Sequence, residues 1–244
     1  MANDNLGNLK SNETGISFYD HLTGLMTMTL FFEVAKDGCD DLFKEGKTPA
    51  VLFVDLSGMK NFNRKYGFVE GDNVLMEFSK LLCEVYGKDR CSRFVQDHFV
   101  IYTDKDILDE KTNLLFDKWE KICPKKKLPI RVGVFILESK DYNIVSACDN
   151  AKVATDLIRN TYVSSINYFD KKLQEDLDKR DYIVSNIDRA IKEKWIKVYY
   201  QPIIRTITGK VCNEEALSRW FDPEKGVLSP ADFIEILEEA HLIY

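Results

Sequence analysis

Residues 50–67 read AVLFVDLSGMKNFNRKYG, and this stretch decides the fold. It opens with a continuous apolar run broken only by Asp55, which predicts a buried strand with a carboxylate at its end. Helical spacing of apolar residues follows over 62–86, in a helix that Gly67 and Gly71 are expected to interrupt. The order of predicted elements is that of a mixed α/β domain with helices covering a central sheet. The other elements are a helix over 30–42, two strands with a tight turn over 91–102, a helix over 107–123, a strand over 130–137, a helix over 144–158 and a short strand over 164–169.

The composition is that of a globular chain without a surface for polyanions. Its 244 residues suggest one full domain and a remainder, since a domain takes about 150 residues. The net charge of −6 argues against nucleic-acid binding, which needs clustered cations. No apolar run approaches the ~20 residues of a membrane span, and the polar N-terminus lacks a signal peptide. The 6 cysteines form no Cys-x-x-Cys pair, so we expect a cytoplasmic protein without disulfides or a membrane segment.

The chain divides into parts of different character. Residues 1–17 are rich in Asn, Gly and Ser and are expected to form a flexible lead-in to a first domain over 18–170. Residues 171–194 alternate in charge sign, which is typical of a solvated helical face and predicts an interdomain helix. Residues 195–244 are expected to begin another domain. Its predicted elements are strands over 198–204 and 211–217 and a helix over 230–240.

Two acidic residues are candidates for a metal pair. Asp55 ends the buried strand, and Asp97 lies at the turn of the predicted hairpin. Carboxylates at such positions can hold a divalent cation over a triphosphate. The alternative is that Asp55 caps the next helix and Asp97 is an ordinary turn residue. The spacing by itself leaves both interpretations open.

Four segments of the first domain carry a recognisable pattern. They are DHLTGL (20–25), VDLSGMKNFNRKYG (54–67), EGDNVL (70–75) and RFVQDHF (93–99). In this order and spacing they resemble the GGDEF family, whose members make cyclic di-GMP from two molecules of GTP. The last segment falls where that family has its Gly-Gly-Asp/Glu-Glu-Phe signature. The resemblance implies an α/β (α+β) domain of the GGDEF type, with a central, mostly antiparallel sheet flanked by helices.

The end of the chain carries a second pattern. Its segments are YYQPI (199–203), EALSRW (215–220) and LSPADFI (228–234). They resemble the opening of the EAL domain, a phosphodiesterase that cleaves cyclic di-GMP. This resemblance implies that a linker helix is followed by the first strands of an incomplete TIM-type barrel.

The first resemblance assigns roles to five residues. Asp55 and Asp97 match metal-binding carboxylates, and Leu56 matches the residue whose backbone carbonyl also meets the metal, Mg²⁺ or Mn²⁺. Asn63 and Asp72 match the two side chains that hydrogen-bond guanine in that family. An amide and a carboxylate suit this role, because together they can donate hydrogen bonds to a base and accept them from it. The alternatives are a surface amide for Asn63 and a helix N-cap for Asp72.

The hairpin departs from the family signature. Val95 and Gln96 stand in place of its two glycines, although such turns need a positive φ that a β-branched residue resists. We therefore expect a rebuilt turn, a narrowed triphosphate pocket, a weakly bound cation and no cyclase activity. His98 is expected to point away from Asp97, because side chains alternate along a strand, and not to bind the metal.

The second resemblance also assigns residues. Glu215 matches a metal ligand of the EAL domain, and Gln201 and Arg219 match positions that contact the substrate. Only 62 residues, 183–244, are present of a barrel that takes about 250. The family's other carboxylates and its lysine base are therefore missing. We expect a fragment of a longer protein that is not itself a working phosphodiesterase.

These residues leave three hypotheses for the function of the first domain. In the leading hypothesis the first domain binds GTP without converting it and regulates an EAL phosphodiesterase, whose intact form binds cyclic di-GMP. In the second, the domain binds no ligand and serves interaction, for example in a homodimer. The third, an active diguanylate cyclase, is the least favoured because the signature is altered.

Overall fold

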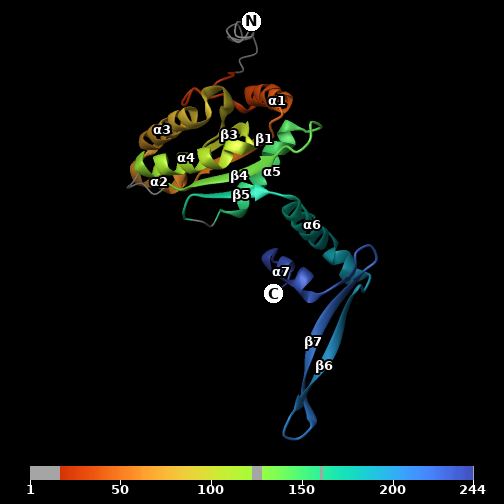
Figure 1. Ribbon diagram of the computed structural model, residues 1–244. Helices are drawn as coiled ribbons and strands as arrows, with labels where there is room; N and C mark the ends of the chain where they lie inside the picture. Colours follow the sequence, from red (N-terminus) through yellow and green to blue (C-terminus); the bar gives the residue numbers. More distant parts are fainter. Residues whose placement is uncertain (1–16, 123–127, 160–161, 244) are drawn as a thin grey trace. The chain divides into compact units, whose positions relative to one another are not determined.

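The computed structural model describes residues 17–122, 128–159 and 162–243 and divides the chain into two compact units (Figure 1). The boundary between the units lies between Phe169 and Asp170. The predicted lead-in, residues 1–17, falls outside the described residues except for Ser17. Each unit is treated separately below.

The first unit is built on a five-stranded sheet in the order β2-β3-β1-β4-β5. The central strand β1 pairs antiparallel with β3 and β4, β2 pairs antiparallel with β3, and only β4 and β5 are parallel. The predicted mixed fold with a mostly antiparallel sheet is therefore confirmed. The strands are β1 (Pro49–Leu56), β2 (Cys91–Val95), β3 (His98–Asp104), β4 (Ile130–Ile136) and β5 (Ser165–Phe169).

Helices cover both faces of this sheet because successive side chains of β1 enter opposite cores. Leu52 and Val54 pack with α2, α3 and α4, whereas Val51 and Phe53 pack with α1 and α5. This alternation places Asp55 on the face of Phe53. The helices are α1 (Met28–Lys44), α2 (Met59–Tyr66), α3 (Phe68–Tyr86), α4 (Leu108–Ile122) and α5 (Ile144–Leu157).

The helix predicted over 62–86 is in fact two helices. The break is at Gly67, whose φ of 88° ends α2 and begins α3. Gly71 was expected to interrupt the helix as well, and that expectation is wrong. Gly71 lies inside α3, where a Cβ would collide with the side-chain amide of Asn63. Its lack of a side chain serves a close approach of two helices and not a turn.

The second unit contains two helices and a three-stranded antiparallel sheet in the order β6-β7-β8. The apolar faces of α6 and α7 enclose Trp220 of β7, which is fully buried. Helix α6 thus contributes Ile183, Ile187 and Ala190 to the core of this unit. The elements are α6 (Lys171–Lys192), β6 (Ile196–Arg205), β7 (Lys210–Asp222), β8 (Gly226–Leu228) and α7 (Pro230–Glu239).

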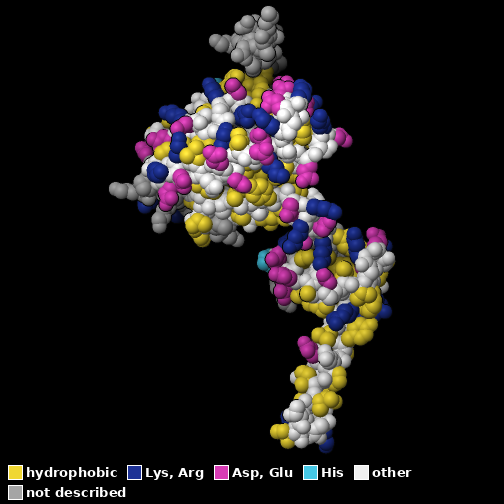
Figure 2. Space-filling view, viewed as in Figure 1, with side chains coloured by type: hydrophobic (Ala, Val, Ile, Leu, Met, Phe, Trp, Pro, Cys, Tyr) yellow, Lys and Arg dark blue, Asp and Glu magenta, His cyan; other side chains and the backbone are white. Residues whose placement is uncertain are grey.

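Strands β6 and β7 are longer than predicted, and most of the hairpin they form is exposed. Figure 2 shows hydrophobic side chains along it. The exposed hydrophobic residues of the hairpin include Tyr199, Tyr200 and Ile204 of β6 and Val211 of β7, each more than half exposed. Among the described helices none is long and apolar enough to cross a membrane.

Candidate functional site

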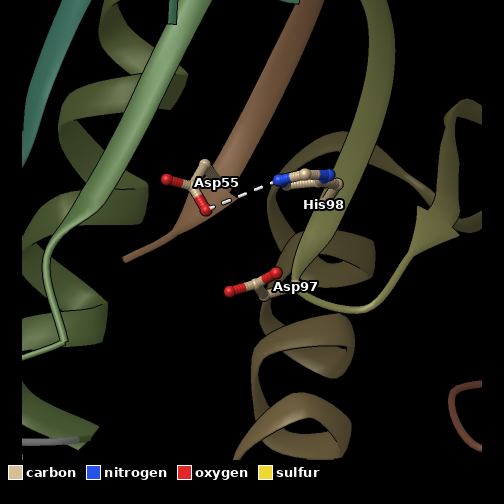
Figure 3. A group of neighbouring side chains, drawn as sticks. All are labelled: Asp55, Asp97 and His98. Atoms are coloured by element: carbon tan, nitrogen blue, oxygen red, sulfur yellow. Dashed lines mark ion pairs between the residues drawn. The ribbon is translucent and has the colours of Figure 1, made fainter. Parts of the chain in front are cut away.

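Asp55, Asp97 and His98 come together at one end of the central sheet (Figure 3). Each offers a ligand atom, and these atoms lie within 4.8 Å of one another. Asp55 is the penultimate residue of β1, Asp97 lies in the turn between β2 and β3, and His98 begins β3. The structure therefore places the two predicted metal carboxylates in one cluster.

His98 does not point away from this cluster, contrary to the prediction. Alternation applies only within a strand, and Asp97 belongs to the turn, so it does not fix the direction of its neighbour. His98 is instead the cross-strand partner of Asp55, with 3.9 Å between its Nε2 and Asp55 Oδ1. Its ring packs against Phe53, two residues before Asp55 on the same face, with ring centroids 5.2 Å apart.

Arg131 approaches Asp55 from the other side. It is the partner of Asp55 in β4, and its Nη1 lies 3.5 Å from Asp55 Oδ2. Burial of Asp55 and the negative charge of Asp97 raise the pKa of the Asp55 carboxyl, against the opposing effects of His98 and Arg131. Asp55 is thus a partly buried carboxylate with a basic side chain from each neighbouring strand.

The titration of Asp55 should make stability depend on pH. The raised pKa means that the folded protein holds this proton more tightly than the unfolded chain does. The contribution of the Asp55 carboxyl to stability is therefore lost as pH rises from the ordinary aspartate pKa of 3.8 to the raised pKa of the folded state. Above that pKa this contribution no longer changes with pH. The amide side chain of the Asp55→Asn variant cannot ionise. The unfolding free energy of this variant, relative to that of the natural chain, should therefore increase as pH rises across this interval. Denaturant unfolding at a series of pH values in EDTA tests this, and parallel profiles would contradict it.

A groove of about 640 Å³ lies beside the cluster. It brings together Asn63, Asp72 and Asp97, which are three of the predicted nucleotide- and metal-binding residues. Asp55 is not among the described residues that line this groove. The other lining residues are Met59, Lys60, Arg64, Phe68, Leu75, Arg93 and Gln96.

Asn63 and Asp72 reach the groove from two helices. Asn63 lies on α2, where its Oδ1 is buried against Gly71 without a hydrogen-bond partner. It is therefore not the surface amide of the alternative interpretation. Asp72 is exposed within α3 and is not a helix N-cap, because that helix begins at Phe68. Both side chains thus line one groove, although Oδ1 of Asn63 is buried.

The backbone of Leu56 connects the end of β1 to the turn. Its N–H donates to the carbonyl oxygen of Asp97 over 3.1 Å, while its side chain lies in the core. This hydrogen bond fixes the position of Asp97 relative to Asp55. The predicted role of the Leu56 carbonyl as a metal ligand stays a prediction.

The turn between β2 and β3 is reorganised around Arg93. The β2–β3 register shifts between Arg93 and Val95, and the side chain of Arg93 ties the turn down. Its Nε donates to Gln96 O over 2.8 Å and its Nη1 to Asp20 Oδ1 over 3.0 Å. Of the two positions where the family has glycine, Gln96 has a positive φ of 52°, whereas Val95 ends β2. The strain expected of this turn therefore falls on Gln96.

Gln96→Gly should stabilise the protein. A left-handed conformation costs a non-glycine residue roughly 1–2 kcal/mol, and the greater freedom of glycine in the unfolded chain offsets part of that. We expect a net gain of up to about 1 kcal/mol in the free energy of unfolding. Val95→Gly is the matched control and should destabilise by about 0.5–1 kcal/mol, because it weakens a strand. Denaturant unfolding measures both, and an equal effect of the two changes would refute the assignment of strain.

The predicted residues of the second unit share one face of its hairpin. Gln201 and Glu215 are direct cross-strand partners, and Arg219 lies on the same side because it is an even number of residues from Glu215. A shallow hollow of about 370 Å³ on that face is lined by Tyr199, Leu217, Arg219, Phe221 and Val227.

Sequence reasoning missed several residues of the site. Arg131 gave no signal, because its contact with Asp55 depends on the β1–β4 register. Lys60, Arg64 and Phe68 lie within or beside the quoted motifs, so their helical positions near Asn63 and Asp72 could have indicated them.

Comparisons with known proteins agree with this geometry. The family model described as diguanylate cyclase, GGDEF domain, matches residues 17–159, and the EAL domain model matches residues 184–244. The cyclic di-GMP phosphodiesterase NbdA of Pseudomonas aeruginosa is 27% identical over 237 residues, which cover 92% of this chain and 30% of NbdA. The chain thus spans under a third of the length of that relative.

Solved structures share the fold. The GGDEF domain of DgcB from Caulobacter crescentus, in complex with c-di-GMP, matches with a TM-score of 0.53 at 14% identity, over 63% of this chain and 96% of that domain. The S helix-GGDEF-EAL part of LapD from Vibrio cholerae, bound to c-di-GMP, matches with a TM-score of 0.53 at 18% identity, over 91% of this chain and 53% of that one. With its GGDEF model matched over most of the first unit and an EAL match behind it, the chain belongs to the GGDEF family of diguanylate cyclase domains.

Proposed function

We propose that the first unit binds GTP without converting it, and that its occupancy regulates an EAL phosphodiesterase within a longer cyclic di-GMP signalling protein. The observation that carries this proposal is the groove of about 640 Å³ that unites Asn63, Asp72 and Asp97. Its volume lies in the range of small-molecule sites.

The groove offers the chemistry that a guanine nucleotide needs. The Asp72 carboxylate accepts hydrogen bonds, as the N–H groups of guanine require, and the Asn63 amide adds a donor. Apolar walls for the base come from Met59, Phe68 and Leu75. Cations for the phosphates come from Lys60 and Arg64, and charge-assisted hydrogen bonds to phosphate are strong.

Two features argue against turnover. The side chain of Gln96 lines the groove where the family signature has glycine, so it takes space from a triphosphate. Arg131 already opposes the charge of Asp55. Asp55 and Asp97 would hold a divalent cation such as Mg²⁺ or Mn²⁺ weakly, and that ion, when bound, would supply charge neutralisation for the phosphates.

The second unit fits the regulated partner in this proposal. NbdA is named a cyclic di-GMP phosphodiesterase, and its similarity extends through this region. Gln201, Glu215 and Arg219 share a face of the hairpin and would serve cyclic di-GMP and a metal in an intact EAL domain. The 244-residue chain itself is proposed to lack both activities.

Calorimetric titration of GTP into the chain tests the proposal. We expect saturable binding without continuing reaction heat. Asn63→Ala and Asp72→Asn should each weaken binding at least 10-fold, because each removes a hydrogen bond to the base worth about 1.5 kcal/mol or more. Asn73→Ala is the matched control, because Asn73 neighbours Asp72 on α3 but does not line the groove. A flat titration of the natural chain, or unchanged affinity in both groove variants, would overturn the proposal.

A second candidate is an interaction module that binds no nucleotide. The observation in its favour is the pairing of Asp55 with His98 and Arg131, which compensates this carboxylate without any ligand. A melting temperature unchanged by saturating GTP would support it, since a ligand of the native state must raise that temperature.

A further inference from the structure

We propose that Asp55, Asp97 and His98 together bind a transition-metal dication in preference to Mg²⁺, with the imidazole of His98 as the discriminating ligand. The inference builds on the proposed divalent-cation site and specifies which class of ion it selects. It does not require that a nucleotide bind.

The geometry suits a single ion. The three ligand atoms lie within 4.8 Å of one another. Ligand distances of about 2.0–2.2 Å place neighbouring tetrahedral ligands of one ion about 3.4 Å apart, so the side chains need to close by up to roughly 1.5 Å. Figure 3 shows the three side chains converging from β1, the turn and β3.

The three positions are fixed by the fold. Asp55 and His98 are register partners of β1 and β3, and the contact with Phe53 holds the ring of His98 with Nε2 toward Asp55. Asp97 is held by the hydrogen bond from Leu56 N–H to its carbonyl oxygen. The backbone positions are therefore set before an ion enters, and only side-chain movement is needed to draw the ligands together.

The donor set decides the class of ion. Mg²⁺ takes oxygen ligands in near-ideal octahedral geometry, whereas an imidazole nitrogen suits Zn²⁺, Fe²⁺, Co²⁺ and Ni²⁺. Two carboxylates and one imidazole therefore favour a first-row transition metal. His98 stands where the GGDEF signature has an acidic residue, so the preference follows from one position of this sequence.

Arg131 sets the strength of the site. It lies against Asp55 Oδ2, which leaves Oδ1, the oxygen nearest His98, for the ion. Its positive charge repels a dication from the same carboxylate, so Arg131→Gln should tighten metal binding while His98→Gln weakens it. These opposite signs separate the two basic neighbours of Asp55.

Titration of Co²⁺ into the 244-residue chain, prepared without a histidine tag and in the absence of nucleotide, tests the proposal. We expect a visible absorption band without a thiolate charge-transfer band, and little displacement by excess Mg²⁺. His98→Gln should weaken Co²⁺ binding at least 10-fold. The matched control is His21→Gln, which alters an exposed histidine outside the cluster and should leave the affinity unchanged.

Three results would overturn the proposal. They are unchanged affinity in His98→Gln, equal weakening in His21→Gln, and displacement of Co²⁺ by an equal concentration of Mg²⁺. Should His98→Gln fail to fold by circular dichroism, Asp97→Asn decides, since retention of the Co²⁺ band in that variant would refute the site. The Co²⁺ titration contains no nucleotide, so a failure of GTP binding leaves its outcome unaffected and the two proposals can be told apart.

Discussion

Gly133→Ala is expected to destabilise the first unit by about 3 kcal/mol or more, because overpacking a rigid contact is costly. Gly133 lies in β4, where the backbone of α5 comes close to the strand. A Cβ there would collide with Ala151 O and would lie 2.5 Å from Thr155 N, and both are backbone atoms of a helix. Thr155 is itself held by its hydroxyl, whose single hydrogen is shared between Phe53 O at 3.1 Å and Ala151 O at 3.0 Å. Neither the strand nor the helix can yield without breaking these contacts.

Amide hydrogen exchange over residues 49–56 and 130–136 measures this effect, because tryptophan fluorescence would also report on Trp195 and Trp220 of the second unit. Gly46→Ala is the control. Gly46 has a φ of 77° and no atom within 4 Å of a built Cβ, so this change should cost only about 1–2 kcal/mol of backbone strain. A Gly133→Ala variant no less stable than Gly46→Ala would show that α5 can move away from the sheet.

Trp220→Ala should destabilise the second unit by roughly 3–5 kcal/mol, the usual range for removing a large buried aromatic side chain. Trp220 is fully buried and packs edge-to-face on Phe233, with ring centroids 5.6 Å apart. Among the described residues of this unit, the buried cluster around Trp220 contains five others, so little other packing compensates for its loss. Amide hydrogen exchange over residues 170–243 measures the change.

Val198→Ala provides the comparison for Trp220→Ala. Val198 is 53% exposed on β6 of the same unit, so its truncation should change stability by less than about 0.5 kcal/mol. Protection lost equally in both variants would mean that the second unit is not organised around Trp220.

The elements of the first unit could be predicted from sequence because their signals are local. The apolar run of β1 and the periodic apolar residues of α4 and α5 identify these elements wherever they pack. The helix break at Gly67 could also be predicted, because glycine commonly ends a helix. Gly71 misled the prediction, since its reason is a contact with Asn63 on another helix, and periodicity carries no information about such contacts.

The site was predictable only in part. Motif resemblance identified Asn63, Asp72 and Asp97, and the structure brings them to one groove. The roles of His98 and Arg131 depend on which residues face Asp55 across β3 and β4, and a shift of one residue in either register would turn them to the other face. Register is set by the assembled sheet, so it could not be read from these segments alone.

Helix α2 has a consequence for how occupancy of the groove would be transmitted. It carries four of the groove residues, Met59, Lys60, Asn63 and Arg64. Of its side chains only Met59 and Phe62 are buried, and the helix ends at Gly67. An element with so few buried contacts opens locally at a small fraction of the global free energy. A ligand that bridges α2 and α3 would suppress this opening. The bound and free states would then differ in the hydrogen-exchange rates of the α2 amides more than in their average structures. The regulated EAL domain would therefore respond to a change in the fluctuations of α2.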